Sequence, residues 1–172
     1  MEHNKDPRRQ LQGAASKAQG KWFEERLDAA FAQYRKNGFA IIEKTPEPMR
    51  PVQCLGGGKF VAFFEKKAQP DYKGIIKGGR TVMFEAKFTG AAKMEQNRVT
   101  EGQAEYLDQH QALGARCYII AGFSSGNVYR FPWPVWKDMK KYFGRKYISE
   151  SDARITGYLV PAMQDGFLLL LD

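Results

Sequence analysis

Hydrophobic residues recur at helical spacing in the first quarter of the chain, between Lys21 and Lys36. The positions that form this stripe are Phe23, Leu27, Ala30, Phe31 and Tyr34. Residues three or four apart lie on one face of a helix, so the stripe predicts a helix with one buried face, ended by Asn37 and Gly38. The first twenty residues lack this periodicity and are basic, and we expect a flexible arm over 1–20.

The rest of the chain alternates strand-like and helix-like segments. Strands are expected at "FAIIEK", at "FVAFFEKK", and at "DYKGIIKGGRTVMFEAKF", where Lys77–Arg80 is the turn of a hairpin. The stretch "TGAAKMEQNRV" has the polar composition of a loop. A second helix is expected over about Thr100–Leu113, then strands at "RCYIIAGF" and "VYRF", a short helix near "PVWKDMKKYF" and a final apolar run, "GFLLLL". This order predicts an α/β fold, with a mixed central sheet flanked by helices in one domain over 21–172.

One predicted strand, "VMFEAKF" (residues 82–88), carries two charges in an otherwise apolar run. Side chains alternate faces along a strand, so Glu85 and Lys87 share a face with Met83. A carboxylate and an ammonium are costly to remove from water unless they are paired or bind an ion. We therefore expect these charges to be used, although a surface ion pair worth about 0–1 kcal/mol is the simpler alternative.

A second carboxylate, Asp71, lies just upstream in "QPDYKG". Pairing of the two strands through the hairpin would bring Asp71 level with Glu85. Two carboxylates and a backbone carbonyl, here that of Ala86, form an oxygen-rich half-shell that suits Mg²⁺. We expect Asp71 and Glu85 as metal ligands. Lys87 would lie beside the attacking water, where it can orient this water or help to take its proton while the cation stabilises charge on a phosphate.

The composition adds a polyanionic partner to this picture. The chain has 27 Lys+Arg against 19 Asp+Glu, a net charge of +8 and a pI of about 9.5, which favours nucleic acid. Cys54 and Cys117 suit free thiols in a reducing compartment better than a disulfide scaffold or a zinc site. The apolar runs are too short to span a bilayer and the N-terminus is polar, so we expect a cytoplasmic protein without membrane contact.

The chain resembles the PD-(D/E)xK nuclease superfamily in its "PD…ExK" signature, which here consists of Pro70, Asp71, Glu85, Ala86 and Lys87. In that superfamily a glutamate on the first helix often completes the metal site, and "GKWFEERL" offers two candidates. Helical geometry places Glu24 roughly 75° from the middle of the apolar stripe and Glu25 roughly 175° away, which favours Glu24. The alternative for Glu24 is an acid near the helix N-terminus that favours the helix dipole.

Gln103 shares one face of the second predicted helix with Tyr106, Leu107 and His110. From there its amide could reach the metal site or its water. Thr100 and Gln103 also have the spacing of a capping box, in which the amide closes the helix end instead. The sequence leaves both roles open.

A longer segment, "DYKGIIKGGRTVMFEAKFT", closely resembles the central part of RecU-type Holliday junction resolvases, and "AIIEKTPEPMRPVQ" resembles the start of that family's stalk. The resemblance covers roughly residues 20–160. It implies a restriction-endonuclease-like fold with a stalk at about 45–67, which protrudes after the first strand and enters the centre of a four-way DNA junction. It also implies a Mg²⁺-dependent homodimer, with Mn²⁺ as a substitute, that resolves branched DNA by paired symmetric nicks and leaves 5′-phosphates. A contact with a recombinase or helicase is left open.

This resemblance gives the cations of the arm and the stalk a candidate role in binding DNA phosphates. These cations are Arg8, Arg9, Lys44, Arg50, Lys59, Lys66 and Lys67. The alternative is a surface hairpin whose lysines only increase solubility. Two other functions also stay open: a catalytically idle, junction-binding recombination mediator, and a nuclease of the same superfamily for another substrate such as flaps or unmethylated duplex.

Overall fold

A five-stranded sheet forms the centre of the computed structural model, which describes residues 7–65, 69–164 and 166–171, with side chains from residue 13 onward. The strands of this sheet, in chain order, are β1 (Ala40–Lys44), β4 (Tyr72–Ile76), β5 (Arg80–Thr89), β7 (Arg116–Phe123) and β8 (Val128–Pro132). Their spatial order is β1-β4-β5-β7-β8. Only the β5–β7 pair of this sheet is parallel, so the sheet is mixed.

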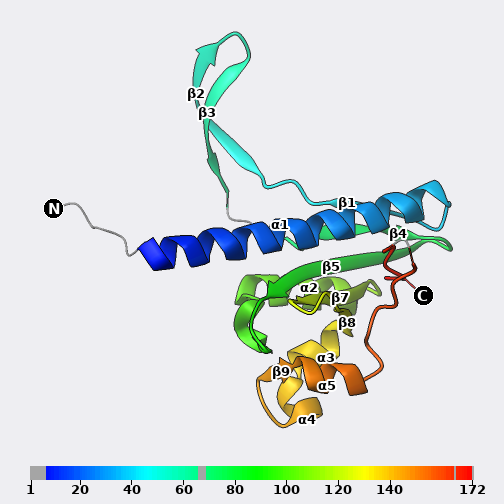
Figure 1. The fold of residues 1–172 in the computed structure, drawn as a ribbon. Coiled ribbons are helices and arrows are strands. Elements are labelled where there is room, and N and C mark those ends of the chain that lie inside the picture. The colour runs from blue at the N-terminus through cyan, green and yellow to red at the C-terminus, as the bar shows by residue number, and fades with distance from the viewer. Residues whose placement is uncertain (1–6, 66–68, 165, 172) are drawn as a thin grey trace.

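Helices and two small two-stranded sheets, β2-β3 and β6-β9, complete the described chain (Figure 1). The helices are α1 (Pro7–Lys36), η1 (a 3₁₀ turn, Gln96–Arg98), α2 (Glu101–Ala112), α3 (Trp133–Lys137), α4 (Met139–Phe143) and α5 (Glu150–Ile155). The remaining strands are β2 (Met49–Gly56), β3 (Lys59–Phe64), β6 (Lys93–Glu95) and β9 (Tyr147–Ser149). Among the described residues, none of these helices has the length and apolar content to cross a bilayer.

The central sheet is covered on both faces (Figure 1). On one face, all five residues of the apolar α1 stripe are buried, and they pack with alternate residues of β5 such as Val82 and Phe84. On the other face, Met83 of β5 and the inner residues of β7 pack with α2, α3 and α5. The expected α/β architecture, a mixed sheet flanked by helices, is confirmed, as is the alternation of faces along β5.

Helix α1 begins at Pro7, not near Lys21 as the hydrophobic pattern suggested. Residues 7–20 are rich in Ala, Gln, Lys and Arg, which have high helix propensity. Side chains 13–19 are exposed, so no apolar stripe marks this part of the helix. The arm expected over 1–20 is therefore corrected for residues 7–20, while residues 1–6 lie outside the described chain.

Two further segments differ from the sequence expectation. The presumed loop before α2 contains β6 and η1, and Met94 of β6 is buried because it pairs with Ile148 of β9. That pairing joins residues far apart in the chain, which local pattern cannot reveal. The final apolar run forms only a bridge between Ala162 and Leu168, yet Leu168 and Leu170 are buried in the cluster beneath α1.

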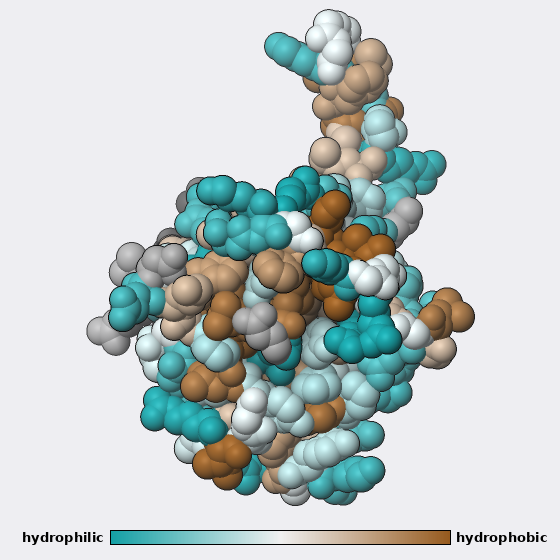
Figure 2. Space-filling model, turned by 90° about the vertical axis from the view of Figure 1, so that its right-hand side faces the viewer, coloured by the Kyte–Doolittle hydropathy of each residue, from teal (hydrophilic) through white to brown (hydrophobic). Residues whose placement is uncertain are grey.

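Strands β2 and β3 form a hairpin, the stalk, that stands clear of the body (Figures 1 and 2). Its tip is a two-residue turn, Gly57–Gly58, in which φ is +59° and +76°. Positive φ at both central residues is the type I′ geometry that matches the twist of a hairpin, and it favours glycine. Every residue of β2 is exposed, so this stretch is regular without being buried.

The two faces of the stalk differ in chemistry. Residues opposite each other in an antiparallel pair share a face. One face is apolar and consists of the pairs Met49–Phe64, Pro51–Ala62 and Cys54–Phe60. The other face is mixed: it pairs Arg50 with Phe63 and Gln53 with Val61, and it carries Lys59 opposite Gly56. The cations of the stalk are therefore presented on one side of it.

Gly74 lies where β4 passes closest to β1, and we expect Gly74→Ala to destabilise the fold by about 3 kcal/mol, the upper range for overpacking. A Cβ there would be 2.0 Å from the Ile41 carbonyl oxygen and 2.6 Å from the Ile42 Cα, and these backbone atoms cannot rotate away. Gly20→Ala is the matched control, because nothing lies within 4 Å of its Cβ position in α1; alanine there should stabilise by about 0.5–1 kcal/mol. Urea unfolding of both variants measures the difference, and equal effects would contradict the close approach.

Candidate active site

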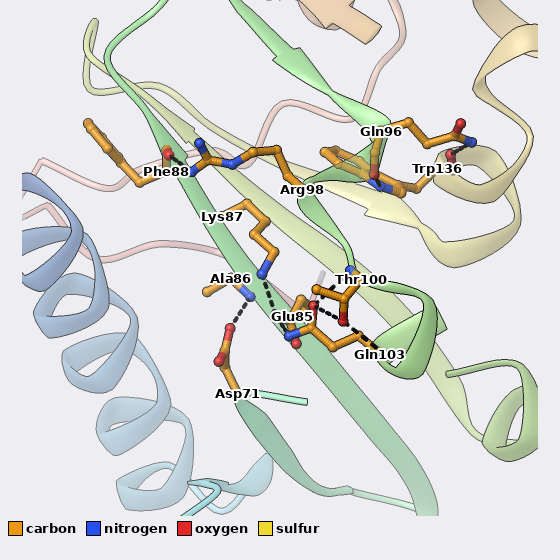
Figure 3. Close-up of polar contacts among 10 residues, drawn as sticks. All are labelled: Asp71, Glu85, Ala86, Lys87, Phe88, Gln96, Arg98, Thr100, Gln103 and Trp136. Carbon is orange, nitrogen blue, oxygen red and sulfur yellow. Dashed lines mark hydrogen bonds and ion pairs between the residues drawn. The ribbon is translucent and has the colours of Figure 1, made fainter. Parts of the chain in front are cut away.

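The β4–β5 hairpin brings Asp71 to the middle of β5. The last pair of this ladder is Tyr72–Phe84, so Asp71 follows one step beyond it, level with Glu85. Asp71 Oδ2 accepts a hydrogen bond from the Ala86 backbone N–H at 2.8 Å (Figure 3). The expected juxtaposition of Asp71 and Glu85 is confirmed, because the short turn after Ile76 fixes the register.

Glu85 is a fully buried carboxylate, with 0% of its surface exposed. Its Oε1 accepts hydrogen bonds from Lys87 Nζ at 2.6 Å and from the side-chain amide of Gln103 (Figure 3). Its Oε2 is buried and has no hydrogen-bond partner among the described residues. A buried carboxylate oxygen without a partner is costly, so a ligand with positive charge beside Oε2 would be stabilising.

Burial is the main reason why the two carboxyl groups of this site have raised pKa values. Burial and, second to it, the neighbouring Asp71 carboxylate raise the pKa of Glu85 to about 7 against the opposing effect of Lys87. Burial also raises the pKa of Asp71, against the hydrogen bond from Ala86 and the charge of Lys87. Two carboxylates that both resist ionisation favour a cation between them, since a cation restores both charged forms.

The donor set fits a hard divalent cation such as Mg²⁺. It consists of the Glu85 Oε2 and the Asp71 carboxylate, and carboxylate oxygen is a ligand type that Mg²⁺ takes. No group of three or more His, Cys, Asp or Glu side chains that could hold a metal occurs among the described residues. Mg²⁺ accepts one or two carboxylates with water as the remaining ligands, so two acids are sufficient.

Mg²⁺ should raise the melting temperature more at about pH 8 than at about pH 6. Glu85 has a folded pKa of about 7 against an ordinary 4.5, and a protonated carboxyl binds metal poorly, so apparent affinity should fall about tenfold per pH unit below 7. Without metal, the stability of the protein should instead fall as pH rises. The folded chain holds the Glu85 proton more tightly than the unfolded chain, so the stability that Glu85 contributes is lost between pH 4.5 and 7.

Melting curves in Mg²⁺ and in EDTA across this range measure both trends. Glu85→Gln should abolish them, and Glu25→Gln, an exposed acid on α1, should leave them unchanged. An equal Mg²⁺ effect at both pH values would contradict the role of Glu85.

Gln103 performs both of the roles that the sequence left open. Its Oε1 accepts a hydrogen bond from the Thr100 backbone N–H at 3.1 Å, and its backbone N–H donates to Thr100 Oγ1, which completes the capping box of α2. Its Nε2 meanwhile donates to Glu85 Oε1. One amide thus caps the N-terminus of α2 and orients the buried carboxylate (Figure 3).

Glu24 is not part of a three-acid cluster in this structure. It faces the β1 edge of the sheet as a half-exposed residue, whereas Glu25 is exposed, as the helical geometry predicted. Its carboxylate forms an ion pair with Lys44 Nζ. Its negative charge nevertheless contributes to the raised pKa of Asp71, so the two acids lie within electrostatic range.

A family model described as "RecU: Recombination protein U" matches residues 18–171 of the chain. The chain belongs to the RecU family.

Curated relatives of this RecU chain are described as "Holliday junction resolvase RecU". The protein from Bacillus pumilus (strain SAFR-032) is 29% identical over 151 residues, which are 82% of this chain and 72% of the relative. The protein from Geobacillus kaustophilus (strain HTA426) is 27% identical over 152 residues, 83% and 76% of the two chains. A solved structure of the Holliday junction resolvase Hjc from Archaeoglobus fulgidus has a TM-score of 0.48 and 18% identity, over 79% of this chain and 93% of that one.

The candidate DNA-binding cations of this RecU chain are dispersed. Arg50 and Lys59 project from the stalk, and Lys44 lies at its base in the ion pair with Glu24. The side chains of Arg8 and Arg9, in the first turn of α1, lie outside the described part, as do Lys66 and Lys67. Their contact with phosphates stays a prediction.

Supporting residues that the sequence did not reveal surround the RecU site. The buried Tyr72 hydroxyl donates to Asp28 Oδ1 at 2.7 Å and ties β4 to α1 beside Glu24. Asp28 follows Glu24 by one helical turn, and this spacing is the sequence signal that could have revealed Asp28 as a supporting residue. Gln96 and Trp136 exchange side-chain-to-backbone hydrogen bonds of 3.1 and 3.2 Å, which anchor η1 just before Thr100.

Proposed function

We propose that this chain is a Mg²⁺-dependent endonuclease that resolves four-way (Holliday) DNA junctions by paired symmetric nicks in recombination and repair. The observation that carries the proposal is the buried Glu85, whose Oε2 has no partner, beside Asp71 and Lys87 in a RecU-family chain. A protein that only bound junctions would have no need to bury acids where phosphates must approach. The relatives' description as Holliday junction resolvases supports the substrate.

Asp71 and Glu85 would hold Mg²⁺, with the Ala86 carbonyl as a further oxygen; Mn²⁺ would substitute. Bound there, the ion supplies Lewis acidity at the scissile phosphate. Gln103 fixes Glu85 through Oε1, which leaves Oε2 for the ion. Lys87, with a side chain only 16% exposed, would orient the attacking water and help to take its proton. In-line attack on the phosphodiester would leave a 5′-phosphate.

Glu24 would join this site once DNA is bound. Its partner Lys44 is half exposed, and an exposed ion pair is worth about 1 kcal/mol or less. A DNA phosphate that binds Lys44 would therefore free the Glu24 carboxylate at little cost. The released acid would then support the metal or its water.

The working unit would be a homodimer in the cytoplasm. A four-way junction requires two symmetric cuts, and one site per subunit of a two-fold dimer provides them. Arg50, Lys59 and the other candidate cations would bind phosphates, while the stalk would enter the junction centre. A contact with a recombinase or helicase would be an additional property of the dimer.

Labelled four-way junctions and matched linear duplex, incubated with the protein in Mg²⁺ or in EDTA, test this function. We expect symmetric nicks near the crossover in Mg²⁺ only. Binding of junctions without metal-dependent cutting would instead indicate a recombination mediator. Cutting of linear duplex at an equal rate would contradict junction resolution and leave a nuclease for another DNA substrate.

A further inference from the structure

A cavity of about 400 Å³ lies between the base of the stalk and the candidate active site. Asp71 and Gln103 are among its lining residues, so it lies beside the place proposed for the scissile phosphate. A nucleotide whose phosphate is held at Asp71 must place its sugar and base within a few ångströms. The cavity is a space that this base could occupy.

Rigid, apolar groups form much of the cavity wall. Pro46, Pro48, Pro70 and Phe64 line it, and proline has a fixed φ and no N–H to satisfy. Two backbone hydrogen bonds fix these walls to each other, from Thr45 N–H to the Asp71 carbonyl at 2.8 Å and from Glu65 N–H to the Pro48 carbonyl at 2.7 Å. A preformed apolar slot of this kind suits a planar ring.

Side chains that can accept hydrogen bonds line this cavity. Its described lining residues include the acids Glu47, Glu65 and Asp71. Gln69 adds an amide at the same wall. Carboxylates and amides at a base edge accept from exocyclic amino groups, as a glutamate does from N4 of cytosine. A base with an amino group therefore fits, and thymine, which has none, fits less well.

We propose that this cavity binds the unstacked base next to the scissile phosphate, and that Glu47 and Gln69 select bases that carry an amino group over thymine. This inference rests on the proposed junction-cutting function and adds a sequence preference to it. Unstacking a base costs a few kcal/mol in duplex DNA and less where pairing is already disturbed. The branch point of a junction is such a place, so the preference would act where the enzyme cuts.

A junction with a mobile core that presents every base beside the cut tests the preference. Wild-type protein in Mg²⁺ should cut next to adenine, cytosine or guanine about tenfold more often than next to thymine. Glu47→Ala and Gln69→Ala each remove an acceptor and should reduce this ratio to near unity, while Glu25→Ala, which makes the same truncation at an exposed acid of α1, should leave it intact. Equal cutting at all bases by the wild type, or a ratio that persists in both cavity variants, would overturn the inference and leave junction resolution standing.

A binding measurement separates this inference from the nuclease proposal. With 2-aminopurine as the flanking base and EDTA in place of Mg²⁺, binding of wild-type protein should raise the fluorescence of the unstacked base. Glu47→Ala should lose this rise at saturating protein, and its melting temperature verifies that it is folded. An unchanged fluorescence with wild-type protein would overturn the inference, whether or not the protein cuts DNA.

Discussion

Lys87→Met is expected to slow junction cutting by about 10²- to 10⁴-fold, the range for loss of a group that assists proton transfer. The same substitution should also destabilise the protein. Lys87 donates to the fully buried Glu85, and removing one partner of a buried ion pair costs about 3–5 kcal/mol, or roughly 10 °C in melting temperature. Junction-cutting rates and melting curves above pH 7 measure the two effects separately.

The double variant Glu85→Gln/Lys87→Met tests the predicted cause of the lost stability. It removes both charges and keeps a side chain that can accept from Gln103, so most of the lost stability should return. Cutting should stay at the level of the single variant or lower. A melting temperature as low as that of Lys87→Met would contradict the unpaired Glu85 charge as the cause of the lost stability.

Shortening the stalk is expected to reduce the preference for junctions over duplex by about tenfold or more. Removing residues 53–56 and 59–61 keeps the Gly57–Gly58 turn, which forms a tight hairpin, but removes the outermost pair of the apolar face, Cys54–Phe60. The stalk has no contact with the core that would make its length necessary for stability, since nearly all of its residues are exposed. Competition binding with labelled junction and duplex measures the preference.

Lys59→Ala in the full-length stalk is the matched control, because it removes one cation and keeps the length. It should weaken binding to junction and duplex alike, as the loss of one phosphate contact does. Equal losses for both substrates in the shortened variant would refute a role of the stalk in junction recognition.

Local pattern was sufficient to predict the parts of the fold that depend on neighbouring residues. The α1 stripe was correct in all five positions because helical period alone determines which residues share a face. Asp71 was correctly placed beside Glu85 because a short turn fixes the hairpin register. The predicted start of α1 was wrong because an exposed part of a helix can have high helix propensity without an apolar stripe.

Contacts between distant segments were beyond the reach of sequence pattern. The ion pair of Glu24 with Lys44 depends on how α1 crosses the edge of the sheet, and helical geometry alone could only turn Glu24 towards the site. The burial of Met94 depends on β9, which follows much later in the chain. The two roles of Gln103 were recognised as alternatives, because the sequence does not show that one amide can satisfy both a helix end and a carboxylate.

The two cysteines differ in a way that gives experimental access to the stalk. Cys54 is exposed on its apolar face, whereas Cys117 is buried, and burial raises the pKa of the Cys117 thiol to about 11. Thiolate is the reactive form, so a maleimide dye should label the stalk selectively without any engineered mutation. The native chain thus carries a ready attachment point from which fluorescence can follow the stalk as it meets DNA.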